Sequence, residues 1–293
     1  MSEFTGMTIS AVLFGVALGL MALGFTISYT VSRGLNFAVG QVVIFPALLA
    51  VKLPAGIPVA LKDLIAIGVT AVGGVVIYLV AIRWPESHGA EPLTLVIITF
   101  GVGLVIEQVV SNAWGSYSFS APTLISGGFS LDHNSVPWQG VLFVAAAVVS
   151  IGALGALQRS TVVGKQLVAL GSSRETARHY GINDVVLVTF AWGLSFAVLG
   201  LAGSLYFPLT GASITTDLTY GVDAFAAAVV GGVGNPGGAL AGGLLVAFVA
   251  TGSGVYLNPN IGDVFTFGLL FLFLIFWPNG LTGSSIDLAG PRA

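Results

Sequence analysis

The chain has 293 residues, of which 56% are hydrophobic and only 7% charged, and its mean hydropathy is +1.00. A soluble domain carries about 25% charged residues, so this composition excludes a water-soluble protein and indicates one that lies in lipid. The twelve acidic and nine basic residues do not provide the basic footprint of a nucleic-acid-binding protein, and the absence of cysteine excludes disulfides and thiolate metal sites.

Nine apolar segments follow one another along the chain. A helix rises about 1.5 Å per residue and the hydrocarbon core is about 30 Å thick, so one crossing takes about 20 apolar residues. Three segments are too short for this, and short membrane helices must be sheltered by protein or line a cavity. The nine segments are 8–30, 36–51, 60–82, 92–112, 139–157, 185–206, 222–233, 238–257 and 262–277, and the short ones begin at 36, 222 and 262.

This pattern predicts an all-α protein, a polytopic transmembrane helical bundle with short, broken membrane helices. No low-complexity linker and no repeat with a period of about 20 to 50 residues interrupts the pattern, so residues 1–293 are expected to form a single transmembrane domain. The first segment is not expected to be a cleaved signal peptide, because the residues before it include Glu3 and no basic residue.

The basic residues predict how the chain is oriented in the membrane, because Lys and Arg are retained on the cytoplasmic side. If the N-terminus lies outside and all nine segments cross, only Lys52 and Lys62 fall outside. We therefore expect a multi-pass protein of the cell (inner) membrane with its N-terminus outside. The basic residues on the cytoplasmic side are then Arg33, Arg83, Arg159, Lys165, Arg174, Arg178 and Arg292.

The longest polar interruption on the basic side covers residues 158–184. Its sequence predicts two short helices joined at Ser172 and Ser173, with Glu175 near the start of the second helix and Arg178 near its end, as the helix dipole favours. Gly181 can supply the left-handed residue that ends a helix. Patterning alone leaves two interpretations open, a solvated loop with some helical turns or a docking element for a cytoplasmic partner.

Four stretches of sequence carry a resemblance to a known family. They are GKQLVALGSSRETARHYGIND at 164–184, GLNFAVGQ at 34–41, DAFAAAVVGGVGNPGGALAGGLL at 223–245 and FWPNGLTG at 276–283. In order and spacing they resemble the permease subunits of ABC importers of the branched-chain amino acid (LIV) type. The resemblance runs from about residue 15 to residue 283, which is nearly the whole chain.

The resemblance implies a permease subunit that translocates a small polar solute and pairs with a second permease, homologous or identical. Two cytoplasmic ATPase subunits and an extracytoplasmic solute-binding protein would complete the importer. The chain would hold no cofactor, because its partners would hydrolyse the ATP. The loop would sit in a groove of an ATPase through Gly164, Lys165, Leu167, Ala169, Leu170, Arg174, Glu175, Ala177, Arg178, Gly181, Ile182 and Asn183.

Within such a groove, Arg174 and Arg178 lie one helical turn apart and are expected to pair with acidic residues of the ATPase. The apolar stripe of Leu167, Val168 and Leu170 would bury in the same groove. Replacing Gly181 by Trp, or Ala177 by Arg, is then expected to abolish co-purification of the ATPase.

Five residues inside the apolar segments are candidates for the translocation pathway. Glu107 is an intramembrane carboxylate, with a pathway role or a local pairing near the outer interface as alternatives. Asp223 is expected to open its short segment at a helix N-terminus, where the resembled family commonly has Lys. That family usually carries Glu at the position of Gln41. The five candidates are Asn36, Gln41, Glu107, Asp223 and Phe225.

Glycines at 234, 238 and 242 recur every fourth residue, which predicts a helix face for close packing against another helix. Gly232, Gly234 and Gly237 also fit G-x-G-x-x-G, but no strand precedes them, so a dinucleotide site is not expected. The chain lacks the G-x-x-x-x-G-K-[ST] pattern, so we do not expect it to bind ATP itself.

Two other classes of protein compete with the importer. An intramembrane protease would need a base beside Ser195, yet His88, His133 and His179 all fall in loops, where they predict no metal site either. An ion-coupled secondary transporter fits the broken helices equally well, but the docking loop favours the importer. Branched-chain amino acids, other amino acids, urea and short amides all stay open as solutes.

Overall fold

The computed structural model describes residues 2–115, 118–213, 217–258, 262–277 and 279–282, so Arg292 and Gly283 lie outside the described residues. The fold is all-α, as predicted, apart from one antiparallel hairpin of β1 (Gly128–Leu131) and β2 (Asn134–Pro137). The helices are α1 (Ser2–Ser32), α2 (Val39–Lys52), α3 (Val59–Ile77), η1 (Tyr78–Ile82), α4 (Arg83–Ser87), α5 (Pro92–Trp114), α6 (Trp138–Ser160), α7 (Val162–Ser172), α8 (Arg174–His179), α9 (Asp184–Thr210), α10 (Asp217–Gly231), α11 (Pro236–Tyr256) and α12 (Gly262–Phe276).

Six helical stretches in the described residues are long and apolar enough to cross a membrane, and three shorter apolar helices lie among them. The short ones are α2, α10 and α12, which correspond to the three short segments expected from the sequence. With 14 residues, α2 spans only about 21 Å. The prediction of a polytopic membrane bundle with short membrane helices is therefore confirmed.

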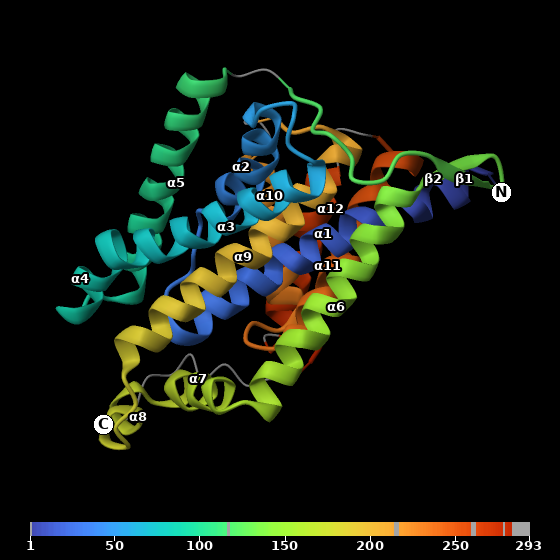
Figure 1. Ribbon diagram of the computed structural model, residues 1–293. Helices are drawn as coiled ribbons and strands as arrows, with labels where there is room; N and C mark the ends of the chain where they lie inside the picture. The colour runs from blue at the N-terminus through green and yellow to red at the C-terminus, as the bar shows by residue number, and fades with distance from the viewer. Residues whose placement is uncertain (1, 116–117, 214–216, 259–261, 278, 283–293) are drawn as a thin grey trace.

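The core of the bundle lies around α1 and α9, while α3, α5 and α6 present most of their surface to the outside. In Figure 1, α1 runs through the middle of the molecule and α5 stands at its edge. Trp192 of α9 is fully buried, and its indole Nε1 donates a hydrogen bond of 2.9 Å to the Ser32 hydroxyl at the end of α1. This bond satisfies the indole in the apolar interior and fixes α9 against the end of α1.

Two of the three packing glycines allow α11 to approach α10 closely. A Cβ atom on Gly238 would overlap the carbonyl oxygen of Gly231, and one on Gly242 would overlap that of Ala227. Gly234 does not share this face, so the predicted stripe is wrong at that position. Gly232 and Gly234 have φ of 94° and 101°, which interrupts the helix after Gly231, and α11 begins only at Pro236.

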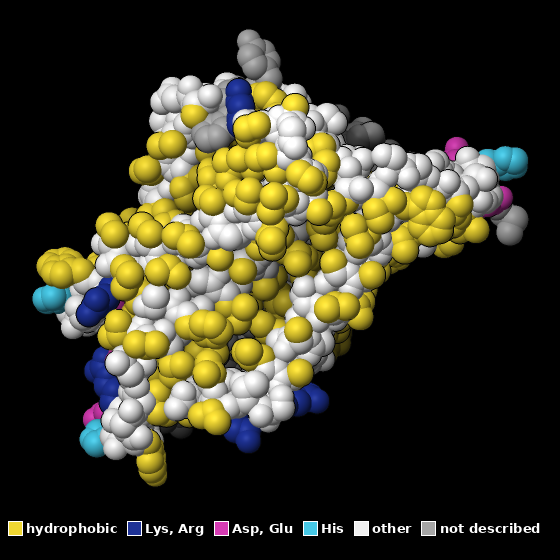
Figure 2. All heavy atoms as spheres, viewed as in Figure 1, with side chains coloured by type: hydrophobic (Ala, Val, Ile, Leu, Met, Phe, Trp, Pro, Cys, Tyr) yellow, Lys and Arg dark blue, Asp and Glu magenta, His cyan; other side chains and the backbone are white. Residues whose placement is uncertain are grey.

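The two ends of the bundle carry different elements. The short helices α7 and α8 lie at one end, and the β1–β2 hairpin lies close to the start of α1 at the other (Figure 1). Most Lys and Arg side chains visible in Figure 2 gather at the α7–α8 end, where α1 and α6 also finish. The charge asymmetry read from the sequence is thus a spatial asymmetry of the folded bundle.

Candidate functional site

Residues 158–184 form the two short helices expected from the sequence. Thr161 caps α7 by accepting a hydrogen bond of 3.0 Å from the Gly164 N–H, and Ser173 caps α8 by accepting one of 3.2 Å from the Thr176 N–H. Gly181 has φ of 74° and closes α8, with its N–H donating to the Arg178 carbonyl over 2.9 Å. The serine turn and the glycine stop therefore give this loop a defined shape.

Two of the three apolar residues predicted to enter the groove, Leu167 and Leu170, face the bundle instead, while Val168 between them is exposed. Leu167 and Leu170 are buried in the core of the chain itself, and so is Ala177 of α8. These side chains point inward because α7 lies across the end of α1. The buried loop residues among the candidates are Gly164, Leu167, Leu170 and Ala177, the half-buried ones are Arg174 and Ile182, and the exposed ones are Lys165, Ala169, Glu175, Arg178, Gly181 and Asn183.

Both arginines of α8 are paired within the chain, with acidic partners that the sequence did not predict. Arg174 donates from Nη2 to Glu86 Oε1 over 3.0 Å and to the Val31 carbonyl over 3.1 Å. Arg178 donates from Nη2 to Asp184 Oδ2 over 2.6 Å, and this hydrogen bond and the Asp184 charge raise the pKa of Arg178. These partners lie at the ends of α1, α4 and α9, which meet beside α8.

A further bond joins the loop to the end of α1, because Arg33 donates to the Gly171 carbonyl at the last turn of α7. The α7–α8 loop is therefore held to α1, α4 and α9 by arginine side chains rather than by apolar packing alone. Such charge-assisted bonds are directional and short, so a displacement of α8 is passed to the helices that they join. The arrangement suits the transmission of movement from outside the membrane into the bundle.

Asn36 lies just before α2 and Gln41 lies on it, and both side chains are buried. The Asn36 Oδ1 accepts from the Ala38 N–H over 3.1 Å, while its Nδ2 and the Gln41 Oε1 have no hydrogen-bond partner among the described residues. The Gln41 Oε1 lies 2.8 Å from the place where a Cβ atom of Gly103 would be. An unsatisfied buried amide atom is costly in a stable core, so these two side chains are unusual among the buried polar residues.

Phe225 of α10 belongs to an aromatic cluster beside these amides. Its ring centroid lies 5.6 Å from that of Phe37 and 5.7 Å from that of Phe25 on α1. Because Phe37 directly follows Asn36 in the chain, this contact brings Phe225 close to Asn36. Glu107 is separate from this cluster and lies half-buried on α5.

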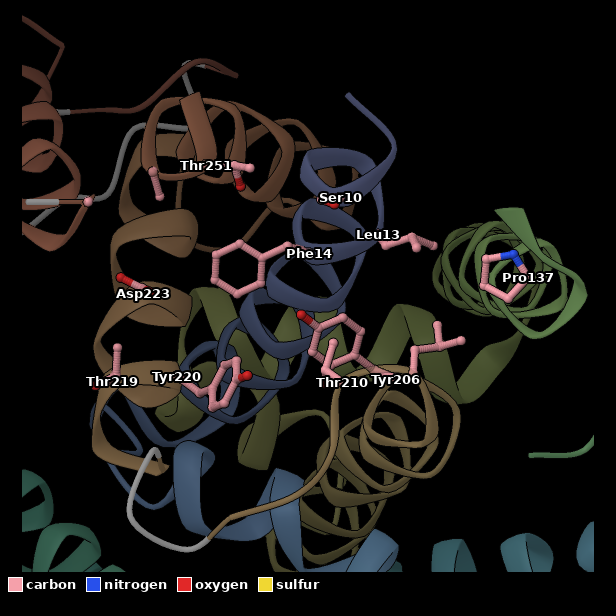
Figure 3. A pocket seen from close by; sticks show the side chains of 13 residues that line it. Ser10, Leu13, Phe14, Pro137, Tyr206, Thr210, Thr219, Tyr220, Asp223 and Thr251 are labelled. Carbon is pink, nitrogen blue, oxygen red and sulfur yellow. The ribbon is translucent and has the colours of Figure 1, made fainter. Parts of the chain in front are cut away.

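Asp223 does not open a helix, which corrects the prediction for this residue. The helix α10 begins at Asp217, so Asp223 lies inside it and away from the N-terminal dipole. Its side chain is only 5% exposed and lines a cavity of about 550 Å³. Figure 3 shows the side chains of Phe14, Tyr206 and Tyr220 extending into the same space from α1, α9 and α10.

Sequence reasoning missed the other residues of this cavity. Thr219, Tyr220 and Asp223 follow the spacing of one helix face, a signal that could have grouped them once the start of α10 was known. Tyr206 and Thr210 come from the end of α9, and only the fold brings them to α10. The tyrosine rings are 6.4 Å apart between centroids.

Comparison with known proteins agrees with this architecture. The chain is 29% identical to the high-affinity branched-chain amino acid transport system permease protein LivH of Escherichia coli (strain K12), over 92% of this chain and 93% of the relative. It is equally identical, 29%, to the corresponding protein BraD of Pseudomonas aeruginosa, over 92% of each chain. The galactose/methyl galactoside import permease protein MglC of E. coli is 26% identical over 97% of this chain and 83% of the relative.

The relatives are permease components of transport systems, which sets aside both the ion-coupled carrier and the intramembrane protease. The matching family model is described as the permease component of branched-chain amino acid transport systems and covers residues 7–274. A match over this length includes most of α1, all of α2 to α11 and most of α12. The chain therefore belongs to this family of importer permeases, and it is a multi-pass membrane subunit of the ABC type.

Proposed function

We propose that the chain moves amino acids across the membrane, with branched-chain amino acids as its principal solutes. The observation that carries this proposal is the family match over residues 7–274, supported by relatives whose names specify branched-chain amino acid transport. The sugar permease MglC is a more distant relative at 26% identity. Urea and short amides are the alternative solutes that the sequence left open.

The chain works in an assembly with three kinds of partner protein. A second permease, identical or homologous, completes the membrane part, and two cytoplasmic ATPase subunits supply energy. An extracytoplasmic solute-binding protein delivers the solute. We assign ATP hydrolysis to the ATPases, because this chain has no phosphate-binding loop in its sequence.

The α7–α8 end of the bundle faces the cytoplasm and the N-terminus lies outside. The basic residues at this end support the orientation, because translocating Lys and Arg is unfavourable. The side chains concerned are Arg33, Arg83, Arg159, Lys165, Arg174 and Arg178. In this orientation the β1–β2 hairpin lies on the outer side of the membrane, where the solute-binding protein docks.

The surface offered to an ATPase is the outer face of α7 and α8. Val168 is 51% exposed and Tyr180 is 82% exposed, although both are large apolar or aromatic side chains. Exposed aromatic and apolar side chains on a compact projection are typical anchors of a protein interface. Val168 and Tyr180, rather than the buried Leu167 and Leu170, are therefore the side chains that enter the groove.

Replacing Val168 by Glu is expected to abolish co-purification of the ATPase, because a charge at the centre of an apolar contact stays desolvated and unpaired. The chain itself should insert and fold normally, since this side chain makes little contact with the bundle. Leu131→Glu is the matched control: Leu131 is 51% exposed on the β1–β2 hairpin at the other end, so the ATPase should remain bound. Normal ATPase recovery with Val168→Glu would contradict the docking surface.

The function itself is tested by uptake into proteoliposomes that contain this chain, its partner permease and the ATPases. Uptake of labelled leucine should require ATP on the α7–α8 side and the solute-binding protein on the other. Competition by unlabelled isoleucine and valine, but not by galactose or urea, would identify the solute class. Uptake driven by an ion gradient with this chain alone would overturn the proposal.

A further inference from the structure

The Asp223 cavity lies at the end of the bundle remote from α7 and α8. Apart from Pro137 of β2, its walls come from five helices: Ser10 lies near the start of α1, Thr210 is the last residue of α9, and Gly262 is the first of α12. Asp223 sits six residues into α10, and Thr251 lies near the end of α11. In the proposed orientation, this is the end at which solute arrives.

The chemistry of the cavity is one-sided in charge. Asp223 is the only carboxylic acid among the described residues that line the cavity, and none of these residues is Lys, Arg or His. Asp223 has interactions within the protein, but a carboxylate offers about four acceptor positions, so a ligand donor can join them. A buried carboxylate is stabilised by an additional positive charge.

Aromatic faces surround the same space. The Phe14 ring lies 6.1 Å from the Tyr220 ring in an edge-to-face arrangement and 6.5 Å from the Tyr206 ring in a stacked one, between centroids. Figure 3 shows these three rings close together, with the Asp223 side chain on the outer side of α10, and all four side chains line the same cavity. A carboxylate together with several aromatic faces is the combination that attracts an organic cation, since the ring faces carry partial negative charge.

We propose that this cavity binds the ammonium group of the transported solute, with Asp223 as its counter-charge and the Phe14, Tyr206 and Tyr220 rings around its body. The inference rests on the proposed import function and deepens it, because it separates amino acids from urea and short amides. Neutral amides carry no full charge to offset the buried carboxylate. The cavity volume of about 550 Å³ accommodates an amino acid of branched-chain size together with water.

The hydroxyl groups of the cavity complete a site for a zwitterion. Ser10, Thr210 and Thr251 line the space with Tyr206 and Tyr220, and their O–H groups can donate to a ligand carboxylate. Neutral donors hold an anion less tightly than Arg or Lys would. A site that binds the ammonium group by charge and the carboxylate by neutral hydrogen bonds favours binding that is specific but readily reversed.

The test uses the assembled importer in nanodiscs, without the solute-binding protein, and two probes of similar size, isobutylammonium and isobutyramide. Saturation-transfer NMR should detect bound isobutylammonium and little isobutyramide. Asp223→Asn, which keeps the shape of the side chain, should weaken isobutylammonium binding by about tenfold or more. Asp132→Asn makes the same chemical change in the exposed turn of the β1–β2 hairpin and should leave binding unchanged.

Transport separates this inference from the proposed function. In proteoliposomes, Asp223→Asn should raise the KM for leucine about tenfold, while the ATPase still co-purifies. If wild-type leucine uptake is ATP-dependent but Asp223→Asn has a normal KM and binds isobutylammonium normally, the ammonium site is wrong and the import function stands. If no ATP-dependent uptake occurs in the wild type, the proposed function itself fails. Equal binding of the two probes by the wild type would also overturn the ammonium site.

Discussion

Replacing Gly242 by Val is expected to destabilise the protein by about 3 kcal/mol or more, which exceeds the usual cost of overpacking a core. The reason is that a Cβ atom at this position would overlap the Ala227 carbonyl oxygen and lie 2.6 Å from the Gly231 nitrogen. Both obstacles are backbone atoms of α10, so no side chain can rotate away. The measurement is the thermal unfolding of the purified chain in detergent, monitored by tryptophan fluorescence and by size-exclusion chromatography.

Gly152→Val in α6 provides the matched control. A Cβ atom on Gly152 would meet nothing within 4 Å, so the same substitution there should change stability by less than about 1 kcal/mol. Unfolding of Gly242→Val at the wild-type temperature would show that α10 and α11 are not packed backbone to backbone. Equal losses in both variants would point to a general effect of valine in these helices.

Replacing Arg174 by Gln is expected to lower ATP-driven uptake strongly while the ATPase remains bound. The variant loses the 3.0 Å bond to Glu86 and the 3.1 Å bond to the Val31 carbonyl, and so detaches α8 from α4 and from the end of α1. The Glu86 side chain is only 9% exposed, so in the variant its carboxylate is largely shielded from water and has lost its arginine partner. We expect a loss of about 1.5–3 kcal/mol in the free energy of unfolding, the range for hydrogen bonds to charged groups.

Two further variants test whether this result depends on the hydrogen bonds that join Arg174 of α8 to the bundle. Arg178→Gln removes a guanidinium whose side chain is 59% exposed, so its effect on stability should stay below about 1 kcal/mol. The double variant Arg174→Gln with Glu86→Gln removes both charges and should recover part of the stability, but not the uptake. Equal effects of the two single arginine variants on uptake and stability would contradict a special role for Arg174.

The one-dimensional pattern of the chain was enough to predict the apolar helices and which three of them are short, although α10 begins five residues before the predicted segment. Apolar runs need a lipid or protein environment wherever they end up, so their positions and the three short members follow from composition alone. Local hydrogen bonding also made α7 and α8 predictable, because Ser173 and Gly181 act on their immediate neighbours. The family resemblance was equally visible, because its motifs are contiguous in sequence.

Which side of α7 and α8 is turned toward the bundle was not predictable from the residues of these helices. Leu167 and Val168 are adjacent and similarly apolar, yet one is buried in the bundle and the other is exposed, because the end of α1 lies on only one side of α7. The partners of Arg174 come from residues 86 and 31, more than 80 positions away in the sequence. Charge alone indicated that this arginine would be paired, but not with which group.

The sequence by itself determined that this protein is a helical membrane permease with a projecting basic loop, since hydrophobicity, helix caps and local motifs act over a few residues. Only the tertiary structure decided that Gly234 leaves the packing face, that Asp223 lies within α10, and that Tyr206 joins it at one cavity. The physical reason is that a cavity and its charge balance depend on which helix ends meet, and these contacts join residues far apart along the chain.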